Sequence, residues 1–274
     1  MTSRIDRRAL LKSSAATALL SASGLSVDAA PRYGGRLRLA IPHADKHFES
    51  VVLGAVYHSL TNIDANGLLR DELATEWRCD RRARNWKLKL RDNIKFHNGE
   101  KLTVQDVANS LINTNFDVES HPSQNSLFIH LNKPDPHLPY RLADIAPIIT
   151  KTGEKINAMN GTGLYRVKRL HPERHFIGDR VKPHQKETTS GWLSEIEIIV
   201  ISDSKVRHEA LRDNFVDAAE FHQAESLPIS SDWSLITGAQ NTHIVVNKRV
   251  GIPPQTGQRK PLDDNRIAER WWMT

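Results

Sequence analysis

The residues of this sequence that could form a metal site are two pairs of histidines. His43 precedes His47 by four positions, and His171 precedes His175 by four. On a helix this spacing places both imidazoles on one face, where they could hold a metal ion. The HExxH motif is absent, the first pair falls in an expected loop, and Pro172 interrupts the second pair. Metal catalysis is therefore a weaker hypothesis than a binding protein without catalysis. A receptor that binds nickel without catalysis is a variant of the metal hypothesis.

A second candidate for chemistry is the S-x-x-K pattern of Ser202 and Lys205, which occurs in some acyl-transfer enzymes. Its companion motifs are missing, and Ser202 or Asp203 would more simply cap a helix. GxSxG and a phosphate-binding GxxxxGK[ST] loop are also absent. Cys79 is the only cysteine, so the chain has no internal disulfide. We therefore expect no enzyme, and we assign no catalytic residue, no metal ligand and no cofactor.

The composition describes an ordinary globular protein. The 274 residues are 39% hydrophobic and 26% charged, which permits one large domain or two smaller ones. A formal net charge of +6 raises the question of a nucleic-acid partner. The basic residues are scattered among acids and form no long run interleaved with aromatics, so no nucleic acid is expected as a partner.

The first thirty residues have the pattern of an export signal. "RRALLKSSAATALLSASGLSVDAA" has a basic start, an apolar middle and a small-residue end, with cleavage expected after Ala29 or Ala30. Arg7 and Arg8 are similar to the pair of a twin-arginine signal, and the general secretory route is the alternative. The sequence therefore predicts a periplasmic protein, and no later segment approaches the about 20 apolar residues of a membrane span.

The elements that would position these residues alternate between strands and helices. "GGRLRLAIP" predicts a first strand, "HADKHFES" a loop, and Val51 to Leu60 a helix. In "WKLKLRDNIKFHNGEKLTVQDVANSL" an alternating strand leads through the turn at Asn98-Gly99 to a capping box of Thr103 and Asp106. A helix should begin at Val104. Later strands are predicted in "SLFIHL", from Leu164, in "EIEIIVI" and in "THIVVNKR", and "GIPPQTGQRKPLDD" has the composition of a linker.

The order of these stretches resembles the bacterial extracytoplasmic solute-binding proteins of the oligopeptide, dipeptide and nickel class. The stretches that carry the resemblance include "GGRLRLAIP", "NWKLKLRDNIKFHNGEKLTVQDVANSL", "NGTGLYRV" and "EIEIIVISDSKVRHEALRDNFVDAAEF". It covers nearly all of the chain after the signal. Leu164 stands where the family usually has proline, and Asn214 where it commonly has glycine.

The resemblance implies an α/β fold of the class II periplasmic-binding-protein type. The first lobe, with a mixed sheet, would comprise residues 31–57 and 158–250, and residues 58–157 would form an inserted β-rich α+β domain. Residues 1–30 are the expected signal. Residues 251–274 would be a linker and the start of a second lobe, so most of that lobe is expected to be missing.

By the same resemblance, the protein would be the solute-binding component of an ABC importer. It would bind peptides or similar small solutes and deliver them to an inner-membrane permease, as a monomer or as the partner of a fragment carrying the other lobe. The expected ligand contacts are Pro42, His43, Ala44 and Asp45, in the loop after the first strand. The alternatives are a receptor for nickel or a metal chelate, and a nonfunctional or split fragment of such a receptor.

Overall fold

The structure is a computed structural model that describes residues 34–44, 46–63, 68–112, 118–123, 125–143, 148–185, 193–222, 230–237 and 242–248. All described residues belong to one compact unit, residues 33–274. The predicted signal and the predicted linker lie outside the described residues.

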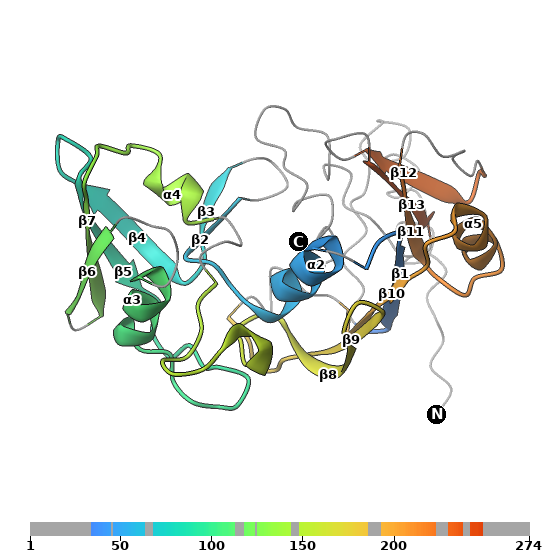
Figure 1. The fold of residues 1–274 in the computed structure, drawn as a ribbon, viewed down its shortest axis with the longest axis horizontal. Helices are drawn as coiled ribbons and strands as arrows, with labels where there is room; N and C mark the ends of the chain where they lie inside the picture. The colour runs from blue at the N-terminus through green and yellow to red at the C-terminus, as the bar shows by residue number, and fades with distance from the viewer. Residues whose placement is uncertain are drawn as a thin grey trace, which may run out of the picture. The chain divides into compact units, whose positions relative to one another are not determined.

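The larger sheet has seven strands in the order β12-β13-β11-β1-β10-β9-β8 (Figure 1). Their bounds are β1 (Arg36–Ile41), β8 (Tyr165–His171), β9 (His175–Arg180), β10 (Glu195–Val200), β11 (Ala218–His222), β12 (Trp233–Thr237) and β13 (Thr242–Asn247). The central strand β1 is parallel to both of its neighbours, β10 and β11. The remaining pairs are antiparallel, so the sheet is mixed as predicted.

One helix packs on each face of this sheet. Leu37, Leu39 and Ile41 alternate along β1 and share a buried cluster with residues of α2 (Lys46–Val56). Ala40 points to the opposite face and shares a second cluster with Ala210 and Leu211 of α5 (Ser204–Arg212). Because successive strand residues face opposite sides, β1 is buried on both faces, as expected of a central strand in an α/β sheet.

The second sheet is antiparallel and has four strands in the order β4-β5-β7-β6. Its bounds are β4 (Ala74–Cys79), β5 (Asn85–Leu90), β6 (Val118–Ser123) and β7 (Ser126–Leu131). Its apolar cluster also takes in residues of α3 (Val104–Ile112) and α4 (Leu138–Arg141). A short β2–β3 hairpin (Thr61–Ile63, Leu69–Asp71) and a 3₁₀ turn, η1 (Ile156–Ala158), complete the described elements.

The predicted strand and capping box in this region are confirmed. Trp86, Leu88 and Leu90 are buried in β5 and alternate with exposed residues. The backbone N–H of Thr103 donates to Oδ2 of Asp106 at 2.8 Å, and the N–H of Asp106 donates to Oγ1 of Thr103 at 3.2 Å. This reciprocal pairing satisfies two donors at the start of a helix, and α3 begins at Val104.

The predicted loop over residues 43–50 is partly wrong. Helix α2 begins at Lys46, so His47 belongs to a helix and not to a loop, and the helix ends at Val56. Phe48, Val51, Val52 and Ala55 are all buried, and their helical spacing extends the apolar stripe into the polar first turn. The described loop residues Pro42, His43 and Ala44 therefore lie close to the end of β1.

Candidate functional site

The candidate site lies at the edge of the seven-stranded sheet where three parallel strands end. β1, β10 and β11 share one direction, so their carboxyl ends, at Ile41, Val200 and His222, meet the same edge. The chain leaves β1 toward α2 on one face, and leaves β10 toward α5 on the other. Open α/β sheets bind ligands outside the carboxyl ends of their strands, at such a point where connections diverge.

The four sequence-predicted contacts begin at this edge. Pro42 directly follows β1 and is buried, whereas His43 is exposed and Ala44 is partly exposed. Asp45 lies outside the described residues. Of the described three, His43 is therefore the one with an exposed polar side chain.

His43 meets a residue that the sequence analysis did not select. Its Nε2 lies 3.2 Å from Nε2 of His222, and the two rings stack with centroids 5.3 Å apart at 27°. His222 is the last residue of β11, which pairs with β1 through Leu39 and Ala40. The two histidines are 179 positions apart, so only the pairing of the strands brings them together. The one signal in the sequence is that His222 ends an apolar run.

The hairpin between β8 and β9 reaches the same edge, since His175 is the register partner of Ile199 near the end of β10. His171, Arg174 and His175 line an open cavity of about 360 Å³. His171 and His175 are register partners in this hairpin, and their rings stack with centroids 6.3 Å apart. Their separation of four positions therefore belongs to a hairpin and not to a helix. Nε2 of His175 lies 2.7 Å from Oε1 of Glu197, so this histidine already has a carboxylate partner.

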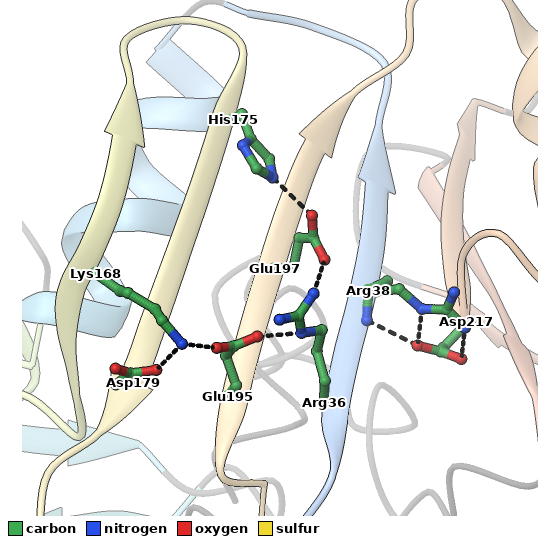
Figure 2. Close-up of polar contacts among 8 residues, drawn as sticks. All are labelled: Arg36, Arg38, Lys168, His175, Asp179, Glu195, Glu197 and Asp217. Atoms are coloured by element: carbon green, nitrogen blue, oxygen red, sulfur yellow. Dashed lines mark hydrogen bonds and ion pairs between the residues drawn. The ribbon is translucent and has the colours of Figure 1, made fainter.

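Charged residues cover part of one sheet face in a continuous set of ion pairs (Figure 2). Arg36 contacts both Glu195 and Glu197, and Nζ of Lys168 lies 2.5 Å from Oε2 of Glu195 and 3.2 Å from Oδ1 of Asp179. Hydrogen bonds to these two carboxylates raise the pKa of Lys168. Each of these side chains has a partner of opposite charge within the set, so these ion pairs help to hold β1, β8, β9 and β10 together.

A separate pair on the same face joins β1 to the start of β11. Arg38 donates from Nε and Nη2 to the two carboxylate oxygens of Asp217 at 3.0 and 2.9 Å, and its backbone N–H donates to Oδ2 at 2.9 Å (Figure 2). The side-chain hydrogen bond with Asp217 raises the pKa of Arg38. This bidentate pair holds β1 and β11 in register and so supports the His43–His222 contact at their far ends.

The other residues with possible chemistry have structural partners. Asp203, not Ser202, caps α5, because its side chain accepts from the N–H groups of Lys205 and Val206. Nε2 of His97 donates to the carbonyl oxygen of Gly163 at 2.9 Å, and burial lowers the pKa of His97. Within the part of the chain that the structure describes, no group of three or more His, Cys, Asp or Glu residues could hold a metal ion. None of the described helices is long and apolar enough to cross a membrane.

Sequence comparison relates this chain to a family of binding proteins and to a transcriptional regulator. The model of the bacterial extracellular solute-binding proteins, family 5 (middle part), matches residues 69–267. The HTH-type transcriptional regulator SgrR of Salmonella typhimurium strain LT2 is 32% identical over 139 residues. That match covers 46% of this chain and 25% of SgrR, so the chain spans a limited part of this curated relative.

Solved structures share the fold at low sequence identity. The binding protein AgaA of A. tumefaciens R10, in complex with agropinic acid, has a TM-score of 0.66 at 18% identity, covering 74% of this chain and 48% of AgaA. DppA of Helicobacter pylori, in complex with peptide STSA, has a TM-score of 0.65 at 16% identity, covering 76% and 51%. The periplasmic-binding-protein fold is thus shown over about half the length of these proteins. The family model covers most of the chain, and the protein therefore belongs to the family 5 bacterial extracellular solute-binding proteins, a family of binding proteins with a role in transport.

Proposed function

We propose that this protein binds a peptide or a similar small organic solute at the carboxyl edge of β1, β10 and β11, and delivers it to an ABC permease in the inner membrane. The observation that carries the proposal is the switch point at this edge, where exposed His43 lies beside His222. Pro42, Ala44 and Asp45 are the proposed neighbours of the solute. Family membership supports solute binding and transport, and the structures of AgaA and DppA hold agropinic acid and peptide STSA, two small organic ligands of those proteins.

The rest of the expected organisation belongs to the same proposal. Residues 31–57 and 158–250 would form the lobe that carries the site, and residues 58–157 the inserted domain. Residues 1–30 would direct export to the periplasm, by the twin-arginine or the general secretory route. The protein would act as a monomer or together with a second fragment that contributes the other side of the site.

The test is a thermal-shift screen of the full chain with short peptides and small organic acids, followed by calorimetry of the best solute. A solute at about 100 times its Kd should stabilise the protein by about 2.7 kcal/mol. His43→Ala should weaken binding, because it removes the exposed side chain at the switch point. The matched control is His137→Ala, an exposed histidine of the region around the four-stranded sheet that should leave the affinity unchanged. Equal loss in both variants, or in neither, would remove the support for this edge.

A second candidate is a solute-sensing module of a transcriptional regulator. The observation that favours it is the 32% identity to SgrR, which exceeds the 18% and 16% identities to AgaA and DppA. The two candidates differ in location, since a sensor that controls transcription works inside the cell. Fractionation of cells that express the full chain should recover it in the periplasm, shortened by about 30 residues at its N-terminus. Recovery of the unprocessed chain in the cytoplasm would favour the regulatory candidate.

A further inference from the structure

The turn between β8 and β9 forms a cavity that is lined only by side chains with basic nitrogens. His171, Arg174 and His175 line this open cavity, and its volume is about 360 Å³. All three side chains can donate hydrogen bonds, and none of them brings a carboxylate into the cavity. The proposed solute contacts do not include these side chains, so the cavity has no role in the proposed function.

Arg174 supplies a guanidinium group without an internal partner. Among the described residues, its side chain forms no ion pair and no hydrogen bond. Its backbone is held on both sides, because its N–H donates to the carbonyl oxygen of His171 at 3.1 Å and its own carbonyl oxygen accepts from the N–H of Val200 at 2.9 Å. The turn therefore fixes where this side chain starts and leaves its five N–H donors available.

His175 is oriented by a carboxylate that has a cation beside it. Its Nε2 lies 2.7 Å from Oε1 of Glu197, and Nη1 of Arg36 lies 3.1 Å from Oε2 of the same carboxylate (Figure 2). The ring of His171 is nearly parallel to that of His175, with 10° between their planes. Glu197 thus positions one imidazole beside the other, and the charge of Arg36 offsets the repulsion that Glu197 would exert on an anion.

The strand that leads to the cavity adds positive charge. Residues 166–174 contain four Arg or Lys residues and a single acid, Glu173. Lys168 has carboxylate partners on β9 and β10, whereas the exposed side chains of Arg166 and Arg169 have none within the described part of the chain. Basic residues on an edge strand also discourage pairing with another chain. That role accounts for the arginines of β8, but not for the cavity at its turn.

We propose that His171, Arg174 and His175 form a binding site for a phosphate group. A guanidinium group donates two parallel N–H bonds to two phosphate oxygens, and the imidazoles can donate to a third. A carboxylate has two oxygens and a single charge, so it uses these donors less fully. The phosphate group comes from a small compound in solution or from the head group of a membrane phospholipid. The second source rests on the proposed function, which places the protein beside the inner membrane.

The phosphate site is separate from the proposed solute site. The strands follow one another in the order β1-β10-β9-β8, and neighbouring strands lie about 4.7–4.9 Å apart. The β8–β9 turn is therefore about 10–14 Å along the sheet from β1, the strand that His43 follows. A phosphate group at the turn does not need His43, so each site can fail in an experiment while the other stands.

The test is calorimetry of the full chain in a buffer of low salt, titrated with sodium phosphate and, at the same ionic strength, with sodium acetate. One equivalent of phosphate should bind, and acetate should bind about tenfold more weakly because it offers fewer oxygens and less charge. Arg174→Gln should weaken phosphate binding by about 10–100-fold, because it removes a hydrogen-bonded charge. Arg174→Lys keeps the charge but loses the paired donors, so its affinity should lie between those of the wild type and Arg174→Gln.

Two control variants separate this site from the general positive charge of the chain. Arg82→Gln removes an exposed arginine from the turn between β4 and β5 and should leave the affinity for phosphate unchanged. His43→Ala should also leave it unchanged, and a loss there would overturn the separation of the two sites. Thermal melts establish that the variants are folded. Equal losses in Arg174→Gln and Arg82→Gln, or equal affinities of the wild type for phosphate and acetate, would overturn the phosphate site.

Sedimentation with phospholipid vesicles distinguishes the two sources of phosphate. Vesicles of phosphatidylglycerol that carry down the wild type but not Arg174→Gln would assign the site to lipid head groups, with vesicles of phosphatidylcholine, which have no net charge, as the control. Binding of phosphate in calorimetry without binding to vesicles would assign it to small phosphate compounds. A wild-type chain that binds neither sodium phosphate nor the vesicles would contradict the proposal and would leave the proposed solute site untouched.

Discussion

The seven-stranded sheet and the four-stranded sheet both bury an apolar cluster, but their polar side chains have different surroundings. Around the four-stranded sheet, the polar side chains of the strand–turn–helix motif form hydrogen bonds to other parts of the chain. Asp106 caps α3 and also accepts from the N–H of Thr152 at 2.8 Å, and His97 binds the carbonyl oxygen of Gly163. At the carboxyl edge of the seven-stranded sheet, His43 and His222 contact each other at the surface. The comparison shows that the polar groups of the first region serve the scaffold, and it is at the second region that we propose solute binding.

The largest expected effect is at the segment that both regions share. A Cβ on Gly161 would lie 1.9 Å from the carbonyl oxygen of Val56, the last residue of α2. The carbonyl oxygen of Gly161 also accepts from the N–H of His97. Gly161→Ala forces backbone apart at the junction, so we expect a loss of about 3–5 kcal/mol in the free energy of unfolding, measured by urea denaturation.

The control for this substitution is Gly153→Ala. Gly153 has a positive φ of 85°, but a Cβ there meets no atom within 4 Å. Its cost should be limited to the strain of a left-handed alanine, about 1–2 kcal/mol. Equal losses in the two variants would show that close packing at the junction does not couple the regions.

The next effect concerns the scaffold behind the site. Arg207 of α5 is fully buried, and it donates to the carbonyl oxygens of Ile201, Ser202 and Glu220 at 2.7–2.9 Å. Arg207→Met keeps much of the volume but leaves these oxygens without that donor, so unfolding should become easier by about 3 kcal/mol. Arg212→Met, on the exposed end of the same helix, should have a much smaller effect in the same denaturation experiment. A mild Arg207→Met phenotype would mean that the turn after β10 does not depend on this side chain.

A smaller effect is expected from the capping box in the other region. Asp106→Ala removes the acceptor for Thr103 and Thr152 and should lower the free energy of unfolding by about 1–2 kcal/mol, as the loss of a helix cap does.

Burial acts to raise the pKa of Asp106, but the hydrogen bonds from Thr103 and Thr152 outweigh it, so its pKa is lowered from 3.8. As the pH falls, the carboxylate of Asp106 is therefore protonated in the unfolded state before it is protonated in the folded state. The stabilisation is complete above about pH 4 and is lost as the pH falls through the folded pKa.

Denaturation of the wild type and Asp106→Asn at several acidic pH values checks this sign. The difference in stability between the two should shrink as the pH falls below 4. A difference that grows in acid would contradict the capping role.

The smallest effect is expected from the set of ion pairs that includes Lys168. Lys168 is half exposed and shares its charge between Glu195 and Asp179. Lys168→Met should lower the midpoint of thermal melting only slightly, and less at high salt than at low salt, because exposed ion pairs are screened. A large fall in the melting midpoint that persists at high salt would show that these ion pairs act as a buried network. They would then contribute more to stability than the capping box does.

Local patterns predicted much of the scaffold. The alternation in residues 85–90 and the Thr103–Asp106 spacing act between near neighbours, so their outcome could be seen in the sequence. The start of α2 was missed because the polar residues of its first turn were assigned to a loop, although Phe48 already fits the apolar stripe. The strands β9 and β12 were not predicted, since "HFIGDR" and "WSLIT" are short and lack regular alternation.

The sequence pointed to one of the two histidines that meet at the candidate site, and the predicted ligand contacts stay a prediction. His43 follows the first strand, and a family resemblance pointed to that loop. His222 could not be selected, because its place depends on β11 pairing with β1, a contact between residues about 180 positions apart. Such a pairing is decided by the burial of whole strands, which a short motif does not encode. The histidine spacing of four was likewise misleading, because at residues 171–175 it spans a hairpin.

Hydrogen–deuterium exchange of the full chain, with and without the solute that stabilises it most, can locate the bound solute. Our account predicts added protection in segments that contain residues 40–46 and 218–222, at the ends of β1 and β11, and no change in residues 85–90 of β5. Protection confined to the four-stranded sheet, with the ends of β1 and β11 unchanged, would contradict it.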